Sequence, residues 1–200
     1  FPMCSSFKLL LAGAALHQAA AGALRLDEQL AYSRADLQPW SPVTEGLLAE
    51  GSMAVAALCA ATLATSDNTA ANLLLARLGG PTAVTTFLRS LGDPVTRLDR
   101  YEPEMNTPHP EWDTSAPRAM AHSLHALLLG DVLAPPHRAR LKAWLQASVT
   151  GGRRLKAGLP AGWSIAEKTG TSDSGSTNDI GVVWSPRGEP LVVAAFIRNS

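Results

Sequence analysis

The chain of 200 residues has little cysteine and no excess of charge of either sign. Cys4 and Cys59 could form at most one disulfide bond, too few for a secreted scaffold held together by disulfides, so we expect both to be reduced and buried. The 17 basic residues balance the 17 acidic ones, and no run of Lys or Arg exceeds two. This balance argues against nucleic acid or an anionic membrane as partner and favours a small molecule.

Motifs for cofactors and metals are also absent from the sequence. No G-x-G-x-x-G or Walker sequence is present, so no nucleotide cofactor is implied. His122 and His125 are three residues apart but lack the H-E-x-x-H pattern, and the other histidines show no metal spacing. We therefore expect neither a metal nor a cofactor.

Residues 3–24 allow two interpretations. Lys8, the apolar run 9–16 and the Ala-rich stretch after it could form a secretory signal, although His17 and Gln18 interrupt the run too early for a membrane span. The same residues favour helix from position 4 to about 20 and are apolar almost all round, which predicts a helix buried inside a domain. We favour the buried helix because further motifs follow at suitable distances.

Periodicity and turn residues predict a mainly helical chain that ends in a sheet. Residues 31–50 are expected to form a loop, and 92–117, with five prolines and no sustained period, a long irregular segment of the kind that is usually functional. Three strands are expected at 163–168, 179–184 and 191–197, the last two joined by a hairpin connection at 185–190. The fold class is therefore predicted as α+β, with helices at 53–64, 69–78, 82–91, 118–129 and 136–148.

Four short motifs follow one another along the chain. An S-x-x-K spacing alone occurs by chance roughly once in a few hundred residues, so it is the ordered set that is informative. The motifs are Ser5-Ser6-Phe7-Lys8, Ser66-Asp67-Asn68, Glu102-Pro103-Glu104-Met105-Asn106 and Lys168-Thr169-Gly170.

The first motif has the chemistry of an activated nucleophile. Ser5 and Lys8 share a helix face, and a buried lysine amine can act as a base for the serine hydroxyl. Taken singly, the pair could be a helix cap followed by a snorkelling lysine, and Ser66-Asp67-Asn68 an N-cap cluster. The presence of all four motifs favours an acyl-transfer site.

In this order the motifs resemble class A serine β-lactamases, and the resemblance covers essentially all 200 residues. It implies a β-lactamase/transpeptidase-like fold, with an all-helical subdomain packed on an antiparallel sheet. We expect residues 1–200 to be a single catalytic domain truncated at both ends. Its region 1–150 would be mainly helical, with a catalytic loop at 92–117, and 151–200 would form an incomplete sheet.

The resemblance assigns roles to individual residues. Ser5 would attack the lactam carbonyl, Ser66 would protonate the departing nitrogen, and Glu102 would activate the water that releases the acyl-enzyme. The backbone N–H groups of Ser5 and Thr171 would form the oxyanion hole. Asn72 would tether the loop that carries Glu102, and an ion pair between Arg100 and Asp113 would close this loop. Glu102-Pro103 is a candidate cis peptide bond. Asp67 would be a buried hydrogen-bond acceptor. The catalytic set is Ser5, Lys8, Ser66, Glu102 and Lys168; the substrate-binding set is Trp40, Asn68, Asn106, Arg154, Thr169, Gly170 and Thr171.

The sequence departs from its family in the segment 107–112, which is about two residues shorter than usual. Shortening could widen the pocket for bulky cephalosporin side chains, or displace Glu102 and slow deacylation. Ala12 and Ser172 stand where some members have cysteines, so neither family disulfide is expected, and Ser172 argues against the disulfide-bearing carbapenemase subgroup.

We therefore predict a β-lactam hydrolase that acts on penicillins and cephalosporins, confers resistance to these antibiotics and requires no cofactor. It is expected to be a monomer, periplasmic or secreted in its full-length form. Three alternatives remain. A penicillin-sensitive transpeptidase or carboxypeptidase would lack Glu102, a β-lactam receptor domain would stay acylated, and a fragment with exposed strand edges could fail to fold.

Overall fold

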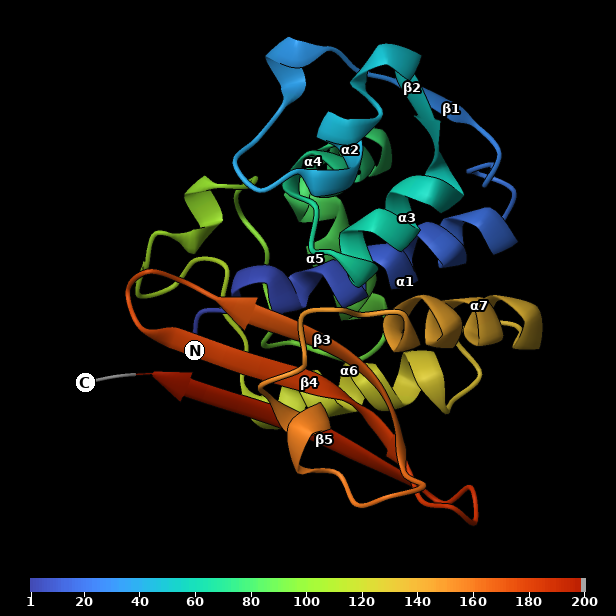
Figure 1. Ribbon diagram of the computed structural model, residues 1–200, viewed down its shortest axis with the longest axis vertical. Helices are drawn as coiled ribbons and strands as arrows, with labels where there is room; N and C mark the ends of the chain where they lie inside the picture. Colours follow the sequence, from blue (N-terminus) through green and yellow to red (C-terminus); the bar gives the residue numbers. More distant parts are fainter. Residues whose placement is uncertain (199–200) are drawn as a thin grey trace.

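The computed structural model describes residues 1–198, in which helices surround a central helix and flank a sheet (Figure 1). The small two-stranded sheet β1 (Gln29–Ala31) and β2 (Ser52–Ala54) lies at the helical end of the molecule. The α-helices are α1 (Phe7–Ala20), α2 (Pro42–Gly46), α3 (Val55–Ala64), α4 (Asn68–Leu78), α5 (Pro81–Ser90), α6 (Pro117–Leu128) and α7 (Pro135–Gln146).

The larger sheet is antiparallel, in the order β3-β4-β5, and is packed against α6 and α7 (Figure 1). Its strands are β3 (Ser164–Thr171), β4 (Ser176–Trp184) and β5 (Pro190–Arg198). The register places Lys168 opposite Ile180 and Thr169 opposite Asp179. Helices on one side of a short antiparallel sheet confirm the predicted α+β class.

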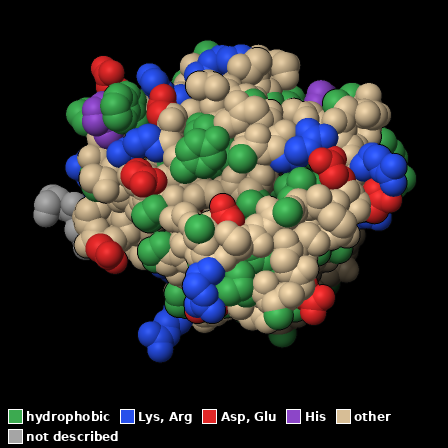
Figure 2. All heavy atoms as spheres, turned by 90° about the horizontal axis from the view of Figure 1, so that it is seen from above, with side chains coloured by type: hydrophobic (Ala, Val, Ile, Leu, Met, Phe, Trp, Pro, Cys, Tyr) green, Lys and Arg blue, Asp and Glu red, His purple; other side chains and the backbone are tan. Residues whose placement is uncertain are grey.

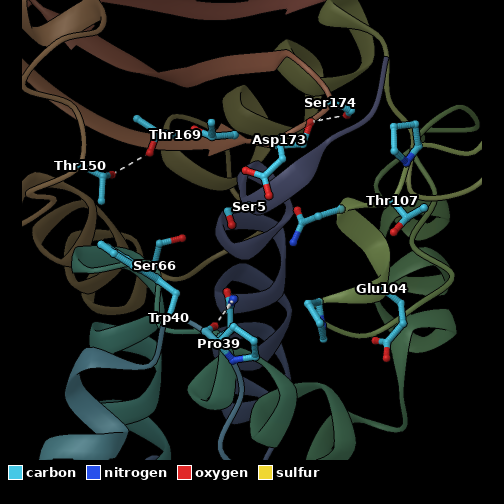
Figure 3. Close-up of a pocket in the computed structure, with 16 residues that line it drawn as sticks. Ser5, Pro39, Trp40, Ser66, Glu104, Thr107, Thr150, Thr169, Asp173 and Ser174 are labelled. Carbon is cyan, nitrogen blue, oxygen red and sulfur yellow. Dashed lines mark hydrogen bonds between the residues drawn. The ribbon is translucent and has the colours of Figure 1, made fainter.

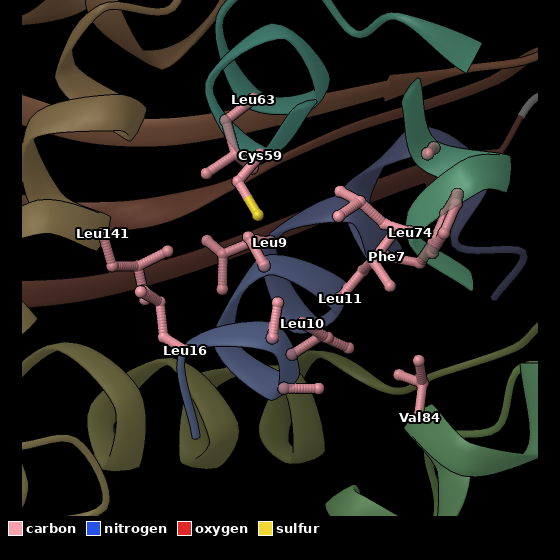
Figure 4. Close-up of a cluster of buried hydrophobic side chains, with 14 of the residues drawn as sticks. Phe7, Leu9, Leu10, Leu11, Leu16, Cys59, Leu63, Leu74, Val84 and Leu141 are labelled. Atoms are coloured by element: carbon pink, nitrogen blue, oxygen red, sulfur yellow. The ribbon is translucent and has the colours of Figure 1, made fainter. Parts of the chain in front are cut away.

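Helix α1 forms the centre of the core (Figure 4). Its residues from Phe7 to Leu16 are all buried, Leu9 and Leu10 completely, and it contacts α3, α4, α5 and α7. A helix that is apolar all round must be covered all round, as the sequence predicted. Residues 7–16 therefore belong to the folded core, which agrees with the favoured interpretation of this segment as a buried helix.

Gly13 explains how α6 comes so close to α1. A Cβ atom at Gly13 would lie 2.8 Å from the Leu127 side chain of α6, inside van der Waals contact. Glycine at this position therefore lets the leucine pack directly on the backbone of α1.

The predicted boundaries differ from the structure most around residue 53. The sequence predicted a helix from Met53, but Met53 pairs with Leu30 in the β1–β2 sheet and α3 begins at Val55. Residues 31–50, expected as a loop, contain η2 (Arg34–Asp36), α2 and η3 (Leu48–Glu50). The β1–β2 pairing is a contact between segments more than 20 residues apart, which local periodicity does not reveal.

Both cysteines are free and buried, as predicted. Burial raises the pKa of the Cys59 thiol to about 12 and that of Cys4 to about 11. Thiols held in this state are poor nucleophiles at neutral pH.

Charged side chains of both signs lie on the face of the molecule that carries the helical end. Figure 2 shows basic and acidic groups interspersed on the face seen from above. Within residues 1–198 no helix has both the length and the apolar character needed to cross a membrane.

Candidate active site

Ser5 lies at the junction between a 3-10 turn and the central helix. The turn η1 (Cys4–Ser6) leads directly into α1, whose first turn carries Lys8. The Lys8 Nζ donates to Ser5 Oγ over 3.2 Å. The i to i+3 spacing thus gives the predicted contact between a hydroxyl and a basic amine.

Lys8 is fully buried and hydrogen-bonded to three other residues. Its Nζ lies 2.8 Å from the carbonyl oxygen of Ser66, 2.5 Å from Asn68 Oδ1 and 3.1 Å from Glu102 Oε1. Burial lowers the pKa of Lys8, and the charge of Glu102 opposes that shift. An amine with a lowered pKa is suited to exchanging protons near neutral pH.

Ser66 and Asn68 are positioned by the connection between α3 and α4. Ser66 has a φ of 65°, and Asp67, the N-cap residue of α4, accepts from the N–H of Ala70 at 2.9 Å. The same carboxylate accepts from the N–H and hydroxyl of Thr44, both at 2.9 Å. Asp67 is fully buried, which confirms its prediction as a structural acceptor that fixes the turn.

A second buried lysine reaches Ser66 from the sheet. The Nζ of Lys168, on β3, donates to Ser66 Oγ at 3.1 Å, while Lys8 Nζ lies 3.3 Å from the same oxygen. Burial, followed by repulsion from Lys8, holds the pKa of Lys168 well below its usual value. Two amines therefore flank one hydroxyl, an arrangement through which a proton could pass.

Glu102 approaches Ser5 from the long loop between α5 and α6. Ser5 Oγ donates to Glu102 Oε1 at 3.4 Å, and Asn106 Nδ2 donates to Oε2 at 2.5 Å. Asn72 on α4 holds the backbone of Glu102 twice, accepting from its N–H at 3.0 Å and donating to its carbonyl at 2.8 Å. The Glu102-Pro103 peptide bond is cis, as predicted.

The predicted ion pair closes this loop. Arg100 Nε contacts Asp113 Oδ2 at 2.6 Å, and the same guanidinium donates to the Thr107 carbonyl at 2.8 Å. Despite the short segment after Asn106, the carboxylate of Glu102 keeps its contact with Ser5. Both expected effects of the shortening, displacement of Glu102 and a wider pocket, stay predictions.

These groups open into a cleft of about 950 Å³ (Figure 3). Ser5 lies at its centre, with Ser66 and Trp40 on one side and Glu104 and Thr107 on the other. The Trp40 side chain borders the cleft, with the residue 68% exposed, and its Nε1 is fixed by a 2.9 Å bond to the Thr65 carbonyl. A rigid exposed ring suits contact with a bound molecule.

The end of β3 forms a further wall of the cleft. Thr169 and Thr171 line it, and Arg154 Nη2 donates to Thr171 Oγ1 at 3.0 Å. Gly170 between them allows β3 to approach η1, because a Cβ there would lie 2.7 Å from the Met3 carbonyl oxygen. A side chain at position 170 would push apart the strand and the turn that carries Ser5.

A sequence profile of the beta-lactamase enzyme family matches residues 1–200. The chain belongs to this family. Among curated β-lactamases, it is 49% identical to "Beta-lactamase FAR-1" of Nocardia farcinica over 202 residues, covering 100% of this chain and 64% of that protein. It is 47% identical to "Carbapenem-hydrolyzing beta-lactamase KPC" of Klebsiella oxytoca, covering 99% and 68%. The chain thus spans about two thirds of the length of the curated relatives it matches.

Solved class A β-lactamases share the fold. The last common ancestor of Gram-negative bacteria (GNCA4) β-lactamase is 54% identical with a TM-score of 0.97, over 100% of this chain and 77% of that one. A β-lactamase from Burkholderia vietnamiensis is 47% identical with the same TM-score, over 99% and 74%. These matches confirm the predicted class A resemblance and the β-lactamase fold.

The cleft of this β-lactamase chain is lined by seven of the predicted site residues, Ser5, Trp40, Ser66, Asn68, Asn106, Thr169 and Thr171. Lys8 and Glu102 contact Ser5, Lys168 contacts Ser66 and Arg154 contacts Thr171, while Gly170 lies between two lining residues. The structure also adds residues that the motifs missed. Thr150 Oγ1 lies 2.7 Å from Thr169 Oγ1 and lines the cleft. Asn178 Nδ2 donates to the carbonyls of Pro2 and Met3, tying β4 to the segment before Ser5. No motif marks these residues, and only the strand register and the fold of the chain place them here. Within residues 1–198, no group of three or more His, Cys, Asp or Glu could hold a metal ion.

Proposed function

We propose that the chain carries the site of a serine β-lactam hydrolase that opens the ring of penicillins and cephalosporins and so confers antibiotic resistance. The observation that supports this most is the convergence of two proton acceptors on one nucleophile. Lys8 Nζ and Glu102 Oε1 lie 3.2 Å and 3.4 Å from Ser5 Oγ. A hydroxyl between an amine and a carboxylate can be deprotonated for attack on the lactam. The ester that forms can then be hydrolysed by a water that one of the two groups activates.

In acylation, Ser5 Oγ would form a bond to the lactam carbonyl carbon while its proton passes to Lys8 or Glu102, both within reach. The backbone N–H groups of Ser5 and Thr171 are the expected oxyanion donors. As the carbon–nitrogen bond breaks, Ser66 would donate its proton to the nitrogen. Its hydroxyl lies 3.3 Å from Lys8 Nζ and 3.1 Å from Lys168 Nζ, so a buried amine can restore the proton.

In deacylation, a water held between Glu102 and Asn106 would attack the ester carbon. Glu102 would accept a proton from the water, and Ser5 would leave with its hydroxyl restored. The short contact between Asn106 Nδ2 and Glu102 Oε2 fixes the orientation of the carboxylate. This step distinguishes a hydrolase from a transpeptidase, which has no equivalent of Glu102, and from a receptor, which stays acylated.

The cleft provides complementary groups for the rest of the substrate. Lys168 supplies positive charge beside this wall. We assign the binding of the substrate's carboxylate to Thr169, Thr171 and Arg154. Asn68 and Trp40 also line the cleft and would contact the side-chain amide and the ring system of the substrate. Cys4 lies beside Ser172, not beside a second cysteine, so this site has no disulfide below the nucleophile.

We also propose that residues 1–200 act as one catalytic domain in a monomer. By its similarity to class A β-lactamases, the full-length protein would be periplasmic or secreted.

Time-resolved intact mass of the full-length protein mixed with a penicillin tests the proposal. We expect an adduct of one penicillin that disappears while opened penicillin accumulates, and no adduct in Ser5→Ala. An adduct that persists for hours with no opened product would assign the site to a receptor or transpeptidase instead.

A further inference from the structure

Two buried carboxyl groups lie behind the wall of the cleft and have no place in the proposed reaction. Glu167 on β3 is 1% exposed, and Asp179 on β4 is 4% exposed. Both oxygens of Glu167 and the Oδ1 of Asp179 are buried, and no donor within residues 1–198 meets them in hydrogen-bond geometry. Because an unpaired buried carboxylate is strongly unfavourable, these three oxygens require an explanation.

A shared proton explains them. Asp179 lies opposite Thr169, two residues from Glu167, so the strand register sets the two acidic side chains diagonally on one face of the sheet. Each carboxyl group shifts the pKa of the other, so the two lie close together. Burial, and then the charge of Asp179, raises the pKa of Glu167 to about 7; burial also raises the pKa of Asp179. A Glu167 carboxyl that is protonated at mildly acidic pH has an O–H that it can donate to Asp179.

The pair supports the segment that crosses β3 at residues 150–155. Asp179 Oδ2 accepts from the N–H of Leu155 at 2.9 Å. At the other end, a Cβ on Gly151 would lie 1.6 Å from Glu167 Oε1, so the backbone of Gly151 rests directly on that carboxyl. The two acidic side chains therefore contact the segment near both of its ends.

This segment carries two side chains that reach the cleft wall. Thr150 Oγ1 contacts Thr169 Oγ1 at 2.7 Å. Arg154 Nη2 donates to Thr171 Oγ1 at 3.0 Å, and its Nη1 donates to the Asn178 carbonyl at 3.2 Å. A shift of the segment on the carboxyl pair would move both groups relative to the wall.

We propose that Glu167 and Asp179, joined by one shared proton, are positioning residues that hold Thr150 and Arg154 against the cleft wall and thereby set the affinity for the substrate's carboxylate. This inference rests on the proposed function for its substrate. Loss of the proton would place two like charges side by side, loosen the contact to Leu155, and add negative charge behind the carboxylate site. Each of these three effects weakens binding of the substrate's carboxylate.

The surrounding charges do not cancel this effect. Lys156 lies near Glu167, while Arg154 and Lys168 lie near Asp179, and all three attract the ionised pair. Even with these cations present, the pKa of Glu167 remains raised to about 7. Lys168 is a second group whose deprotonation could weaken carboxylate binding as pH rises, because burial lowers its pKa. The test must therefore separate Glu167 from Lys168.

The first experiment measures KM and kcat of the full-length protein for a penicillin between about pH 5 and about pH 8.5. We expect KM to rise on the order of tenfold as pH passes through about 7. The value of kcat at saturation should change less, because the contacts to the substrate's carboxylate are made equally in the ground state and in the transition state. In Glu167→Gln the amide can still donate to Asp179 but cannot ionise, so KM should stay near its low-pH value throughout. Glu189→Gln removes an exposed carboxylate from the β4–β5 turn and should keep the parent profile.

Two further measurements make the result decisive. For the methyl ester of the same penicillin, which has no carboxylate, the pH dependence of KM should disappear in the parent protein. A carbon-13 titration should show one Glu carboxyl with a pKa of about 7 that is absent from Glu167→Gln. An unchanged KM profile in Glu167→Gln would overturn the proposal and assign the pH dependence to Lys168. If the parent protein does not hydrolyse penicillin, the proposed function fails. The carbon-13 titration tests the shared proton independently of that result.

Discussion

Replacing Glu102 with alanine should separate the two halves of the proposed reaction. The structure gives Lys8 its own contact with Ser5, 3.2 Å between Nζ and Oγ, so the nucleophile keeps a base when Glu102 is removed. Loss of the carboxylate also removes an attraction that raises the pKa of buried Lys8, so more of its amine is neutral. We expect acylation to remain detectable.

Deacylation should fall by a large factor. Glu102 is 2% exposed and is held by Asn106 and Asn72, so no other carboxylate can occupy its position without rearrangement. Loss of a positioned general base typically costs about 10²- to 10⁴-fold. That factor corresponds to about 2.7–5.5 kcal/mol in the barrier to hydrolysis of the ester.

A stopped reaction followed by intact mass spectrometry measures both steps. The full-length Glu102→Ala protein is mixed with a penicillin, free antibiotic is removed, and the decay of the adduct is followed. Glu111→Ala is the matched control, because Glu111 lies in the same loop, is exposed and does not line the cleft, and its turnover should stay within a few-fold of the parent. Release of the adduct from Glu102→Ala at the parent rate would refute the assigned role.

Three other substitutions test parts of the scaffold. Asp67→Ala leaves buried donors without an acceptor and should lower the free energy of unfolding by about 2–4 kcal/mol, measured by urea denaturation; a change below about 0.5 kcal/mol would contradict the capping role. Asn72→Ala removes both contacts to the Glu102 backbone and should slow deacylation about 10-fold or more while acylation persists; equal slowing of both steps would count against it. Gly170→Ala forces a Cβ to 2.7 Å from a backbone oxygen and should slow acylation about 10²-fold in burst kinetics, and a parent-like burst would argue against the close approach.

Most helices were predictable because their signals are local. The predicted helix 69–78 matches α4 to within one residue, and Gly79 ends it in the left-handed region with a φ of 100°. Pro81 opens α5 at its first position, one residue before the predicted start at 82. The start of α3 was wrong because pairing between β1 and β2 overrode the helical preference of residues 53 and 54. Local preference is a weak guide wherever a distant segment supplies hydrogen bonds.

By itself, the sequence determined the chemical groups of the site and the short-range contact between Ser5 and Lys8, since four motifs in order and one helical spacing contain that information. Only the tertiary structure decided that Lys168 meets Ser66 across 102 positions and that Glu167 lies beside Asp179. Strand register and burial create these contacts, and burial also shifts the pKa values on which proton transfer depends. Neither the register of a sheet nor the exclusion of water from a side chain is specified within a motif, because both arise from the packing of the whole chain.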